Sequence, residues 1–229
     1  EASLLAFVDG KTVVPMIASQ DHKRIFDGDK GPNTGGMGTY APAPVLTDAL
    51  RDEAMKTILE PMVAAMEKEG MPYVGCLYAG LMITPQGPKV VEFNARFGDP
   101  ETQVVLPLLD SDLGQIMMAC ATGTLTANMV KWKDSSAACV ILASKGYPET
   151  SSKGDVIHGD IKQHDTTIVF HSGTKLIGDE YVTNGGRVLG VVGLGKDLRT
   201  ALDRAYERIE HIDFEGMQYR TDIGAKAFK

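Results

Sequence analysis

Three things are missing from this 229-residue chain, and each absence excludes a class of protein. No apolar run approaches the length of a membrane-spanning helix, and the first residues show no signal-peptide pattern. Basic residues form no block, and 23 Lys and Arg against 30 Asp and Glu give a net charge of -7. We therefore expect a cytoplasmic protein with no nucleic-acid partner and no membrane partner.

Cysteine is also scarce. Cys76, Cys120 and Cys139 lie far apart in the sequence and form no CxxC pair. We therefore expect three reduced and mostly buried thiols, and neither disulfides nor a zinc site. Four of the five histidines lie singly in the second half, where none has another ligand-type residue at metal-site spacing, so we expect structural or surface roles for them.

The composition does contain enough apolar residues for a sizeable core, at 43% of the chain. Strand patterns and helix patterns are mixed before residue 134, and β-type patterns dominate after it. The polar stretch 132–136 looks like a boundary. We predict an α+β fold with domains at 1–134 and 135–229, the second one small, rich in strands and carrying one helix.

Two antiparallel hairpins are predicted in the first domain. Residues 1–8 and 11–16 flank an Asp9-Gly10 turn signal, and residues 73–83 are followed by a turn into the strand that begins at Val90.

Helix signals lie between and after these hairpins. Thr47 is expected to cap a long helix that Gly70 ends and that Pro61 kinks or divides. Ser111 is expected to cap a second helix over 112–121.

In the second domain, Asp197 is expected to cap the one helix. Apolar runs bounded by turn signals predict the strands 137–144, 166–171, 175–177, 180–183 and 187–193.

The most informative stretch is 90–102. Side chains alternate along a strand, so three polar side chains should project from one face: Glu92, Asn94 and Arg96. The opposite face is apolar and is expected to be buried: Val91, Phe93 and Ala95.

The polar face suits a hydrated Mg²⁺ held by one or two protein oxygens together with substrate phosphates. The Arg96 guanidinium could hold a phosphate or acyl-phosphate oxygen. The next residues predict a helix start, with Asp99 as its cap and Pro100 and Glu101 in the first turn. A surface strand with Glu92 and Arg96 as a solvated pair remains the alternative.

Residues 18–24 are expected to begin extended and then pass into a long irregular loop, which includes residues 26–40 and continues to Pro44. Its glycines would let backbone amides converge on a phosphate, although it has neither a Walker pattern nor GxGxxG. A flexible glycine-rich loop is the alternative. His22, between Asp21 and Lys23, is compatible with a polar site.

Several stretches together resemble the glycinamide ribonucleotide synthetases, or phosphoribosylamine–glycine ligases, which are ATP-grasp enzymes of purine synthesis. The matching segments follow the family's order and cover nearly the whole chain. They are Glu1-Ala2-Ser3, Gln20-Asp21-His22-Lys23-Arg24, Gly31-Pro32-Asn33-Thr34-Gly35-Gly36-Met37-Gly38, Tyr78-Ala79-Gly80-Leu81-Met82, Glu92 to Thr102, Gly154-Asp155-Val156-Ile157-His158-Gly159 and Thr183-Asn184-Gly185-Gly186-Arg187-Val188.

The resemblance implies a reaction in which ATP, glycine and 5-phosphoribosylamine give glycinamide ribonucleotide, ADP and phosphate through a glycyl phosphate. It also implies the larger half of an ATP-grasp domain, an antiparallel sheet with helices, followed by the carboxy-terminal domain. The implied cofactor is Mg²⁺ or Mn²⁺, with ATP as co-substrate.

The resemblance further implies roles for individual residues. Metal ligands would be Glu92 and Asn94, ATP contacts Glu1 and Glu92, and catalytic residues Arg96 and Asp99. The remaining residues that the resemblance assigns would bind substrate or phosphate: Asp21, His22, Lys23, Asn33, Thr34, Gly35, Gly36, Glu101 and Thr102.

Two departures from the family's pattern stand out. The strand before the Glu-x-Asn pair, Leu77 to Met82, lacks the acid that many ATP-grasp enzymes carry there. The chain also begins directly in a strand pattern at Glu1, without Met, so we expect a fragment that is inactive alone. Two other functions stay open: another ATP-grasp carboxylate–amine ligase, and a non-catalytic binding module on the same scaffold.

Overall fold

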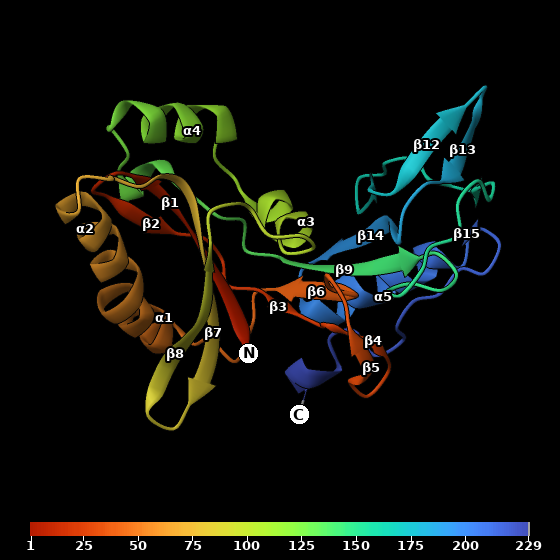
Figure 1. Ribbon diagram of the computed structural model, residues 1–229, viewed down its shortest axis with the longest axis horizontal. Coiled ribbons are helices and arrows are strands. Elements are labelled where there is room, and N and C mark those ends of the chain that lie inside the picture. Colours follow the sequence, from red (N-terminus) through yellow and green to blue (C-terminus); the bar gives the residue numbers. More distant parts are fainter. Residues whose placement is uncertain (229) are drawn as a thin grey trace. The chain divides into compact units, whose positions relative to one another are not determined.

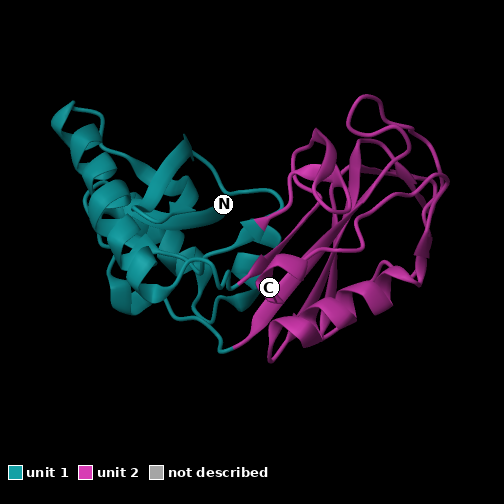
Figure 2. Cartoon of the chain, turned by 90° about the horizontal axis from the view of Figure 1, so that it is seen from below, with its two compact units in different colours: residues 1–20, 42–134 teal, residues 21–41, 135–229 magenta. Residues whose placement is uncertain are grey.

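The computed structural model describes residues 1–228, with helices and strands labelled in Figure 1. They fall into two compact units (Figure 2). Unit 1 comprises residues 1–20 and 42–134, and unit 2 comprises residues 21–41 and those from 135 onwards. The segment 21–41 therefore packs with the residues from 135 onwards and not with the rest of residues 1–134.

Unit 1 is built on an antiparallel sheet of four strands in the order β2-β1-β7-β8. Its strands are β1 (Ala2–Asp9), β2 (Val13–Pro15), β7 (Val74–Thr84) and β8 (Gly87–Asn94). Both predicted hairpins are confirmed. The Asp9 carboxylate closes the first turn by accepting hydrogen bonds from the backbone amides of Lys11 and Thr12.

Three consecutive helical segments supply the main helical packing of unit 1: α1 (Asp48–Ala54), the π-helical η1 (Met55–Leu59) and α2 (Glu60–Lys68). Thr47 caps the first through the Leu50 amide. The predicted division near Pro61 is confirmed: proline has no N–H to continue the α-helical pattern, and the preceding Glu60 N–H bonds instead to the Met55 carbonyl. Apolar residues of these helices share one core with β1 and β7.

Two sequence-based helix starts are wrong, by two residues and by one residue. After the central stretch, α3 (Thr102–Val105) begins at Thr102, and the Asp99 side chain instead accepts a hydrogen bond from the side-chain amide of Gln103. In α4 (Leu113–Thr122) the cap is Asp112, which accepts from the Gln115 N–H, because the Ser111 hydroxyl accepts from the Lys131 N–H. Short 3₁₀ turns, η2 (Leu106–Leu108) and η3 (Ala127–Met129), complete the unit.

Unit 2 contains a five-stranded sheet in the order β11-β14-β9-β6-β3. Its strands are β3 (Gln20–Asp21), β6 (Gly38–Ala41), β9 (Ser136–Ala143), β11 (Thr167–His171) and β14 (Arg187–Gly195). All eight residues of β9 are buried. Helix α5 (Leu198–Ile209), capped by Asp197 as predicted, packs its apolar residues against this sheet.

The start of the segment 18–44 is extended as expected, in β3. The irregular loop predicted after it, up to Pro44, is wrong, because that stretch contains a hairpin of β4 (Arg24–Phe26) and β5 (Lys30–Asn33), and β6, which pairs antiparallel with β9. Gly38 permits that pairing, since a Cβ there would lie 2.7 Å from the Cys139 carbonyl oxygen. Periodicity did not reveal these strands because each has only two to four residues, and β6 pairs with a strand about a hundred residues later.

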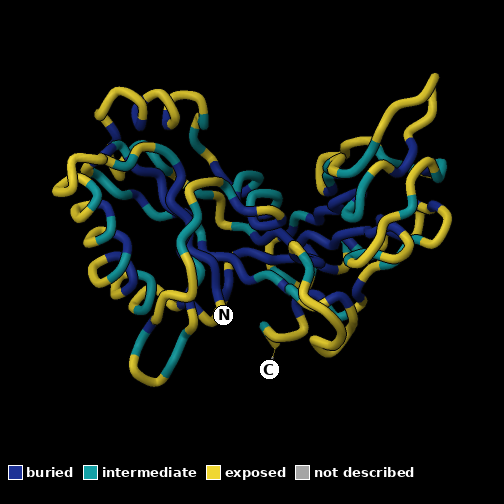
Figure 3. The backbone as a smooth tube through the Cα atoms, in the orientation of Figure 1, coloured by how far each residue is buried: buried dark blue, intermediate teal, exposed yellow. Residues whose placement is uncertain are grey.

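The remaining elements of unit 2 are small: the pair β10 (His158–Gly159) and β15 (Ile212–Asp213), the hairpin β12 (Thr174–Ile177) and β13 (Glu180–Thr183), and the 3₁₀ turn η4 (Ala225–Phe228). Each unit has its own buried core, visible as the dark segments of Figure 3.

The three cysteines are free and buried, as predicted. Burial is the main cause that raises the pKa of the Cys76 thiol to about 12. Within residues 1–228, no helix has the length and apolar character that a membrane crossing requires.

Candidate functional site

The predicted polar row, which we call the β8 row, forms with Glu92 and Asn94 on β8 and Arg96 two residues beyond its end. The Asn94 amide donates to the Glu92 carboxylate at 3.0 Å, and the Arg96 guanidinium donates to the Asn94 carbonyl oxygen at 3.5 Å. Glu92 and Arg96 are exposed, and Asn94 is half-buried. An acid, an amide and a guanidinium therefore stand in contact on an accessible surface.

The opposite face of β8 is buried less than predicted. Phe93 packs on the core of unit 1, whereas Val91 is 60% exposed. The register between β7 and β8 shifts at Gly80 and Leu81, so strict alternation is interrupted there. The sequence carried no signal for this bulge apart from Gly80 itself, where a Cβ would crowd the Glu92 side chain at 3.2 Å.

The Glu92–Asn94 pair fits a divalent cation that keeps most of its ligands from water or phosphate. Two neighbouring oxygens around an octahedral Mg²⁺ lie about 2.9 Å apart. The Asn94 amide nitrogen lies 3.0 Å from the Glu92 carboxylate, so a half-turn of that amide group puts its oxygen at a suitable separation. Across residues 1–228, no three His, Cys, Asp or Glu side chains are grouped to hold a metal, so the protein would supply two ligands.

Beyond the strand, Glu101 is held inside unit 1. It is 3% exposed, and its carboxylate accepts hydrogen bonds from the Tyr78 hydroxyl at 3.0 Å and the Ser3 hydroxyl at 3.2 Å. Gly98 makes room for it, because a Cβ there would lie 2.4 Å from a Glu101 oxygen. Through these hydrogen bonds, Glu101 connects the turn after β8 to Ser3 in β1 and to Tyr78 in β7.

The neighbours of Glu101 differ in accessibility. Asp99 is exposed, Thr102 is half-buried, and the Thr102 hydroxyl donates to the Gly98 carbonyl. Glu1 is exposed, and its carbonyl accepts from the Gln20 side chain. Sequence reasoning did not single out Ser3 or Tyr78, although both lie in the segments that carry the family resemblance.

In unit 2 the three consecutive residues 21–23 have different environments. The Lys23 ammonium pairs with the Asp21 carboxylate at 2.8 Å and is partly exposed. His22 is 1% exposed: its Nδ1 lies 3.2 Å from the Gly38 carbonyl oxygen, and the Gly224 N–H donates to its Nε2 at 3.4 Å. His22 therefore contributes through packing, whereas Lys23 remains accessible to an anion.

The glycine-rich turn after β5 uses its amides internally. The Thr34 N–H donates to the Lys23 carbonyl, the Gly35 N–H to the Tyr147 hydroxyl, and the Gly36 N–H to the Thr34 hydroxyl. The Arg187 guanidinium also donates to the Gly35 carbonyl at 2.9 Å. An anion bound there would have to replace these bonds. Asn33, the last residue of β5, is exposed.

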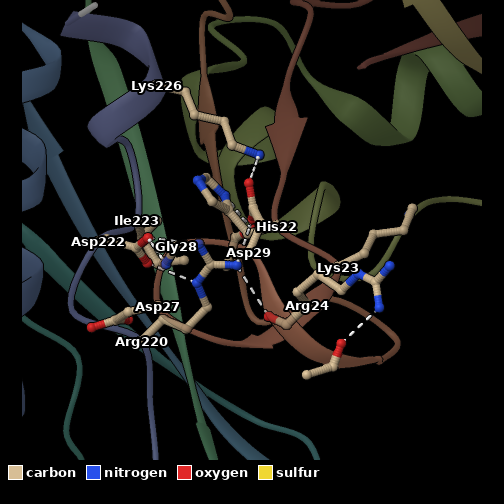
Figure 4. Close-up of polar contacts among 12 residues, drawn as sticks. His22, Lys23, Arg24, Asp27, Gly28, Asp29, Arg220, Asp222, Ile223 and Lys226 are labelled. Atoms are coloured by element: carbon tan, nitrogen blue, oxygen red, sulfur yellow. Dashed lines mark hydrogen bonds and ion pairs between the residues drawn. The ribbon is translucent and has the colours of Figure 1, made fainter.

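Sequence reasoning missed an ionic network around Arg220 (Figure 4). Arg220 is 1% exposed and donates through two nitrogens to the Asp222 carboxylate, and through the third to Asp29 and to the Arg24 carbonyl. Lys226 pairs with the other oxygen of Asp29 at 2.7 Å. The available signal was the polar stretch 221–224, for which no secondary structure could be predicted.

The surroundings of His22 predict a pH-dependent stability. Burial, aided by the charges of Arg220 and Lys226, lowers its pKa to about 4 from 6.5. In the neutral ring with its proton on Nδ1, Nδ1 donates to the Gly38 carbonyl and Nε2 accepts from the Gly224 N–H. Protonation of Nε2 removes this acceptor and brings two N–H donors face to face. Between pH 6.5 and about 4 the unfolded chain binds the extra proton, so stability falls as the pH falls.

The expected loss over that window is on the order of 3 kcal/mol. Denaturant unfolding of the wild type and of H22Q, repeated from pH 7 to pH 4, measures it, and the variant should show the flatter dependence. H158Q, at an exposed histidine, is the control and should keep the wild-type slope. Equal slopes for wild type and H22Q would contradict the assignment.

The same architecture occurs in solved structures. The biotin carboxylase domain of the Hydrogenobacter thermophilus 2-oxoglutarate carboxylase superposes with a TM-score of 0.67, over 95% of this chain and 46% of that one, at 13% identity. That likeness shows a shared fold and confirms the predicted fold class.

The family follows from the sequence matches. Residues 1–102 match the model of the phosphoribosylglycinamide synthetase ATP-grasp (A) domain, and residues 137–226 match that of its C domain. The chain belongs to the phosphoribosylglycinamide synthetase family.

Its relatives bear corresponding names. A phosphoribosylamine–glycine ligase from Synechocystis is 52% identical to this chain, and the match covers 99% of this chain and 55% of that protein. One from Caulobacter vibrioides is 53% identical, and the match covers 100% of this chain and 54% of that protein. The Thermotoga maritima phosphoribosylamine–glycine ligase structure superposes with a TM-score of 0.86, at 35% identity, over 98% of this chain and 56% of that one. The chain spans about half the length of these relatives.

Proposed function

We propose that the full-length protein containing this chain is a phosphoribosylamine–glycine ligase. It joins glycine to 5-phosphoribosylamine and cleaves ATP to ADP and phosphate. The family match and the names of the relatives support this proposal. The structural observation that carries it is the hydrogen-bonded row of Glu92, Asn94 and Arg96 at the end of β8.

Each member of that row has a role in this proposal. Glu92 and Asn94 hold a divalent cation, Mg²⁺ or Mn²⁺, which neutralises phosphate charge when it is bound. Glu92 also faces ATP, together with Glu1. The exposed Arg96 guanidinium steadies the oxygens of the transferred phosphoryl group or of the acyl phosphate. Asp99, exposed just beyond the strand, contacts the glycine amine or a ribose hydroxyl.

The segment of unit 2 that includes Lys23 and Asn33 binds the phosphate-bearing substrate in this proposal. Lys23 and Asn33 offer accessible donors, and Asp21 holds the Lys23 ammonium in place. Thr34, Gly35 and Gly36 shape the adjoining turn through their internal hydrogen bonds. Three further residues support the site indirectly, through packing and hydrogen bonds within their own units: His22, Glu101 and Thr102. We place the enzyme in the cytoplasm, with small molecules as its partners.

The test is ADP formation by the full-length protein, with glycine and with 5-phosphoribosylamine generated in solution. ADP release that needs both substrates and gives glycinamide ribonucleotide supports the proposal. ADP release driven by bicarbonate or by another carboxylate would assign the protein to a different ATP-grasp reaction. No nucleotide turnover with any carboxylate would favour a binding module. Residues 1–229 alone are expected to be inactive or nearly so, since the relatives have about as many residues again.

Replacing Arg96 by lysine tests the geometry of the phosphate contact. The guanidinium presents a planar fork of donors, and an ammonium offers a single point charge. We expect R96K in the full-length protein to lower kcat by about tenfold to a hundredfold, with an unchanged melting temperature because Arg96 is exposed. R51K, which alters a half-buried arginine of α1 that pairs with Asp48, is the control. A kcat in R96K equal to that of R51K would remove Arg96 from the reaction.

A further inference from the structure

The hairpin β4–β5 has few apolar contacts of its own. All four residues of β5 are exposed, and in β4 Ile25 alone is buried, in a small cluster with Met37 and Ala143. A two-stranded hairpin is marginally stable in isolation, so other contacts must hold this one in place.

Those contacts come from residues 220–226, which we call the carboxy-terminal clamp (Figure 4). Arg220 reaches the hairpin at both ends: it donates to the Arg24 carbonyl in β4 at 3.1 Å and to the Asp29 carboxylate in the turn at 2.9 Å. Lys226 pairs with Asp29 at 2.7 Å, and Asp222 accepts from the Gly28 N–H at 2.8 Å.

Further bonds extend the clamp on either side. Asp27 in the turn accepts from the Thr221 N–H at 2.8 Å and from the Thr221 hydroxyl. Immediately before the hairpin, buried His22 accepts from the Gly224 N–H. The clamp therefore engages the hairpin strand, its turn and the segment that leads into it.

The charges of the clamp require Arg220 to be in place. One buried guanidinium is shared between Asp222 and Asp29, and without it both carboxylates would face each other across a partly buried space. Burial alone would raise the pKa of Asp222, but the hydrogen bonds from Arg220 and Gly28 hold it well below its usual range. The ionised carboxylates and the guanidinium thus form one cooperative unit.

The hairpin is flanked by residues of the proposed substrate site. Lys23 and Asp21 precede β4, Asn33 is the last residue of β5, and Thr34 to Gly36 follow it. A shift of the hairpin moves both sets together, because the Lys23 carbonyl accepts from both the Thr34 N–H and the Thr34 hydroxyl. The position of Lys23 and Asn33 therefore depends on what holds the hairpin.

We propose that Arg220 is a positioning residue for substrate binding: through Asp29 and the Arg24 carbonyl it fixes hairpin β4–β5, and thereby orients Lys23 and Asn33 toward the phosphate of the amine substrate. This rests on the function proposed above. Arg220 itself, at 1% exposure, does not touch substrate. It acts on affinity for one substrate and leaves the chemistry of the β8 row unchanged.

The experiment uses the full-length protein and the variants R220K and D29N. D29N keeps the two bonds between Arg220 and Asp222 and weakens the link to the hairpin turn, so it tests the idea even where R220K folds poorly. The matched control is R208K, because Arg208 is another buried arginine of unit 2, and its partners are Asp160 and the Lys162 carbonyl.

We expect D29N and R220K to raise KM for 5-phosphoribosylamine by about tenfold, while KM for glycine and kcat change little. Amide hydrogen exchange should accelerate across residues 24–36 and stay slow in β9. R208K should leave both measurements at their wild-type values.

Two outcomes would overturn the positioning role. If the wild type is active and the variants keep the wild-type KM for the amine, the inference fails and the proposed function stands. A purely structural role of Arg220 gives the same outcome: the variants yield a smaller amount of folded, active enzyme, and its KM values are those of the wild type. If the wild type does not consume glycine and the amine at all, the proposed function fails and takes the inference with it.

Discussion

Glu92→Gln in the full-length protein lowers kcat by about two orders of magnitude or more and raises the Mg²⁺ concentration needed for half-maximal rate. The substitution keeps the shape of the side chain and removes its charge, which is what attracts the cation. Stability should change little, because Glu92 is exposed and its carboxylate accepts a hydrogen bond from a neighbour on the same strand. Steady-state rates at a series of Mg²⁺ concentrations, with melting curves alongside, measure both expectations.

The matched control is E60Q, which removes another exposed carboxylate of unit 1 at the start of α2. It should retain the wild-type rate and the wild-type Mg²⁺ dependence. Wild-type turnover in E92Q would exclude Glu92 from the site, and it would favour the alternative in which Glu92 and Arg96 are an ordinary solvated pair. A loss of activity accompanied by unfolding would contradict the claim that Glu92 is dispensable for the fold.

The second large effect concerns the packing of α5 on β14. A Cβ added at Gly193 would lie 2.0 Å from the Ala201 carbonyl oxygen and 2.7 Å from the Ala205 nitrogen, both in the helix backbone. Backbone atoms cannot rotate away as side chains do, so α5 has to move off the sheet and open the core of unit 2. We expect G193A to lower the free energy of unfolding by about 3 kcal/mol.

The control lies in the same strand. A Cβ at Gly190 would meet the Cys139 sulfur at 3.2 Å and the Ile141 side chain at 3.5 Å, and both can adjust. Thermal melts and denaturant titrations should therefore show a much smaller loss for G190A than for G193A. Equal losses would mean that any added methyl group in β14 is harmful and that the helix contact at Gly193 is unimportant.

Local patterns in the sequence were sufficient for much of this fold. The Asp9 turn, the Thr47 and Asp197 caps and the alternation of Glu92, Asn94 and Arg96 each depend on residues a few positions apart. A short-range signal of this kind survives in the folded chain because the same local bonds form there.

Features set by distant partners could not be predicted. β6 is a strand because β9, about a hundred residues later, is available to pair with it. The burial of Glu101 also depends on distant residues, since the Ser3 and Tyr78 hydroxyls donate to its carboxylate in the interior of unit 1. The Arg220 network joins residues almost 200 positions apart, and nothing in the spacing of Asp27, Asp29 and Asp222 indicated it.

The insertion of β6 beside β9 limits how the chain can be dissected. A piece that begins at Ser135 would lack β6, and β9 would then become the border of its sheet with one row of backbone N–H and C=O groups unpaired. Because all eight residues of β9 are apolar or small and buried, that border would attract strands of other molecules. The second family-model match starts at residue 137, so a recombinant module cut at that point would be prone to aggregation, whereas one that retains residues 21–41 would not.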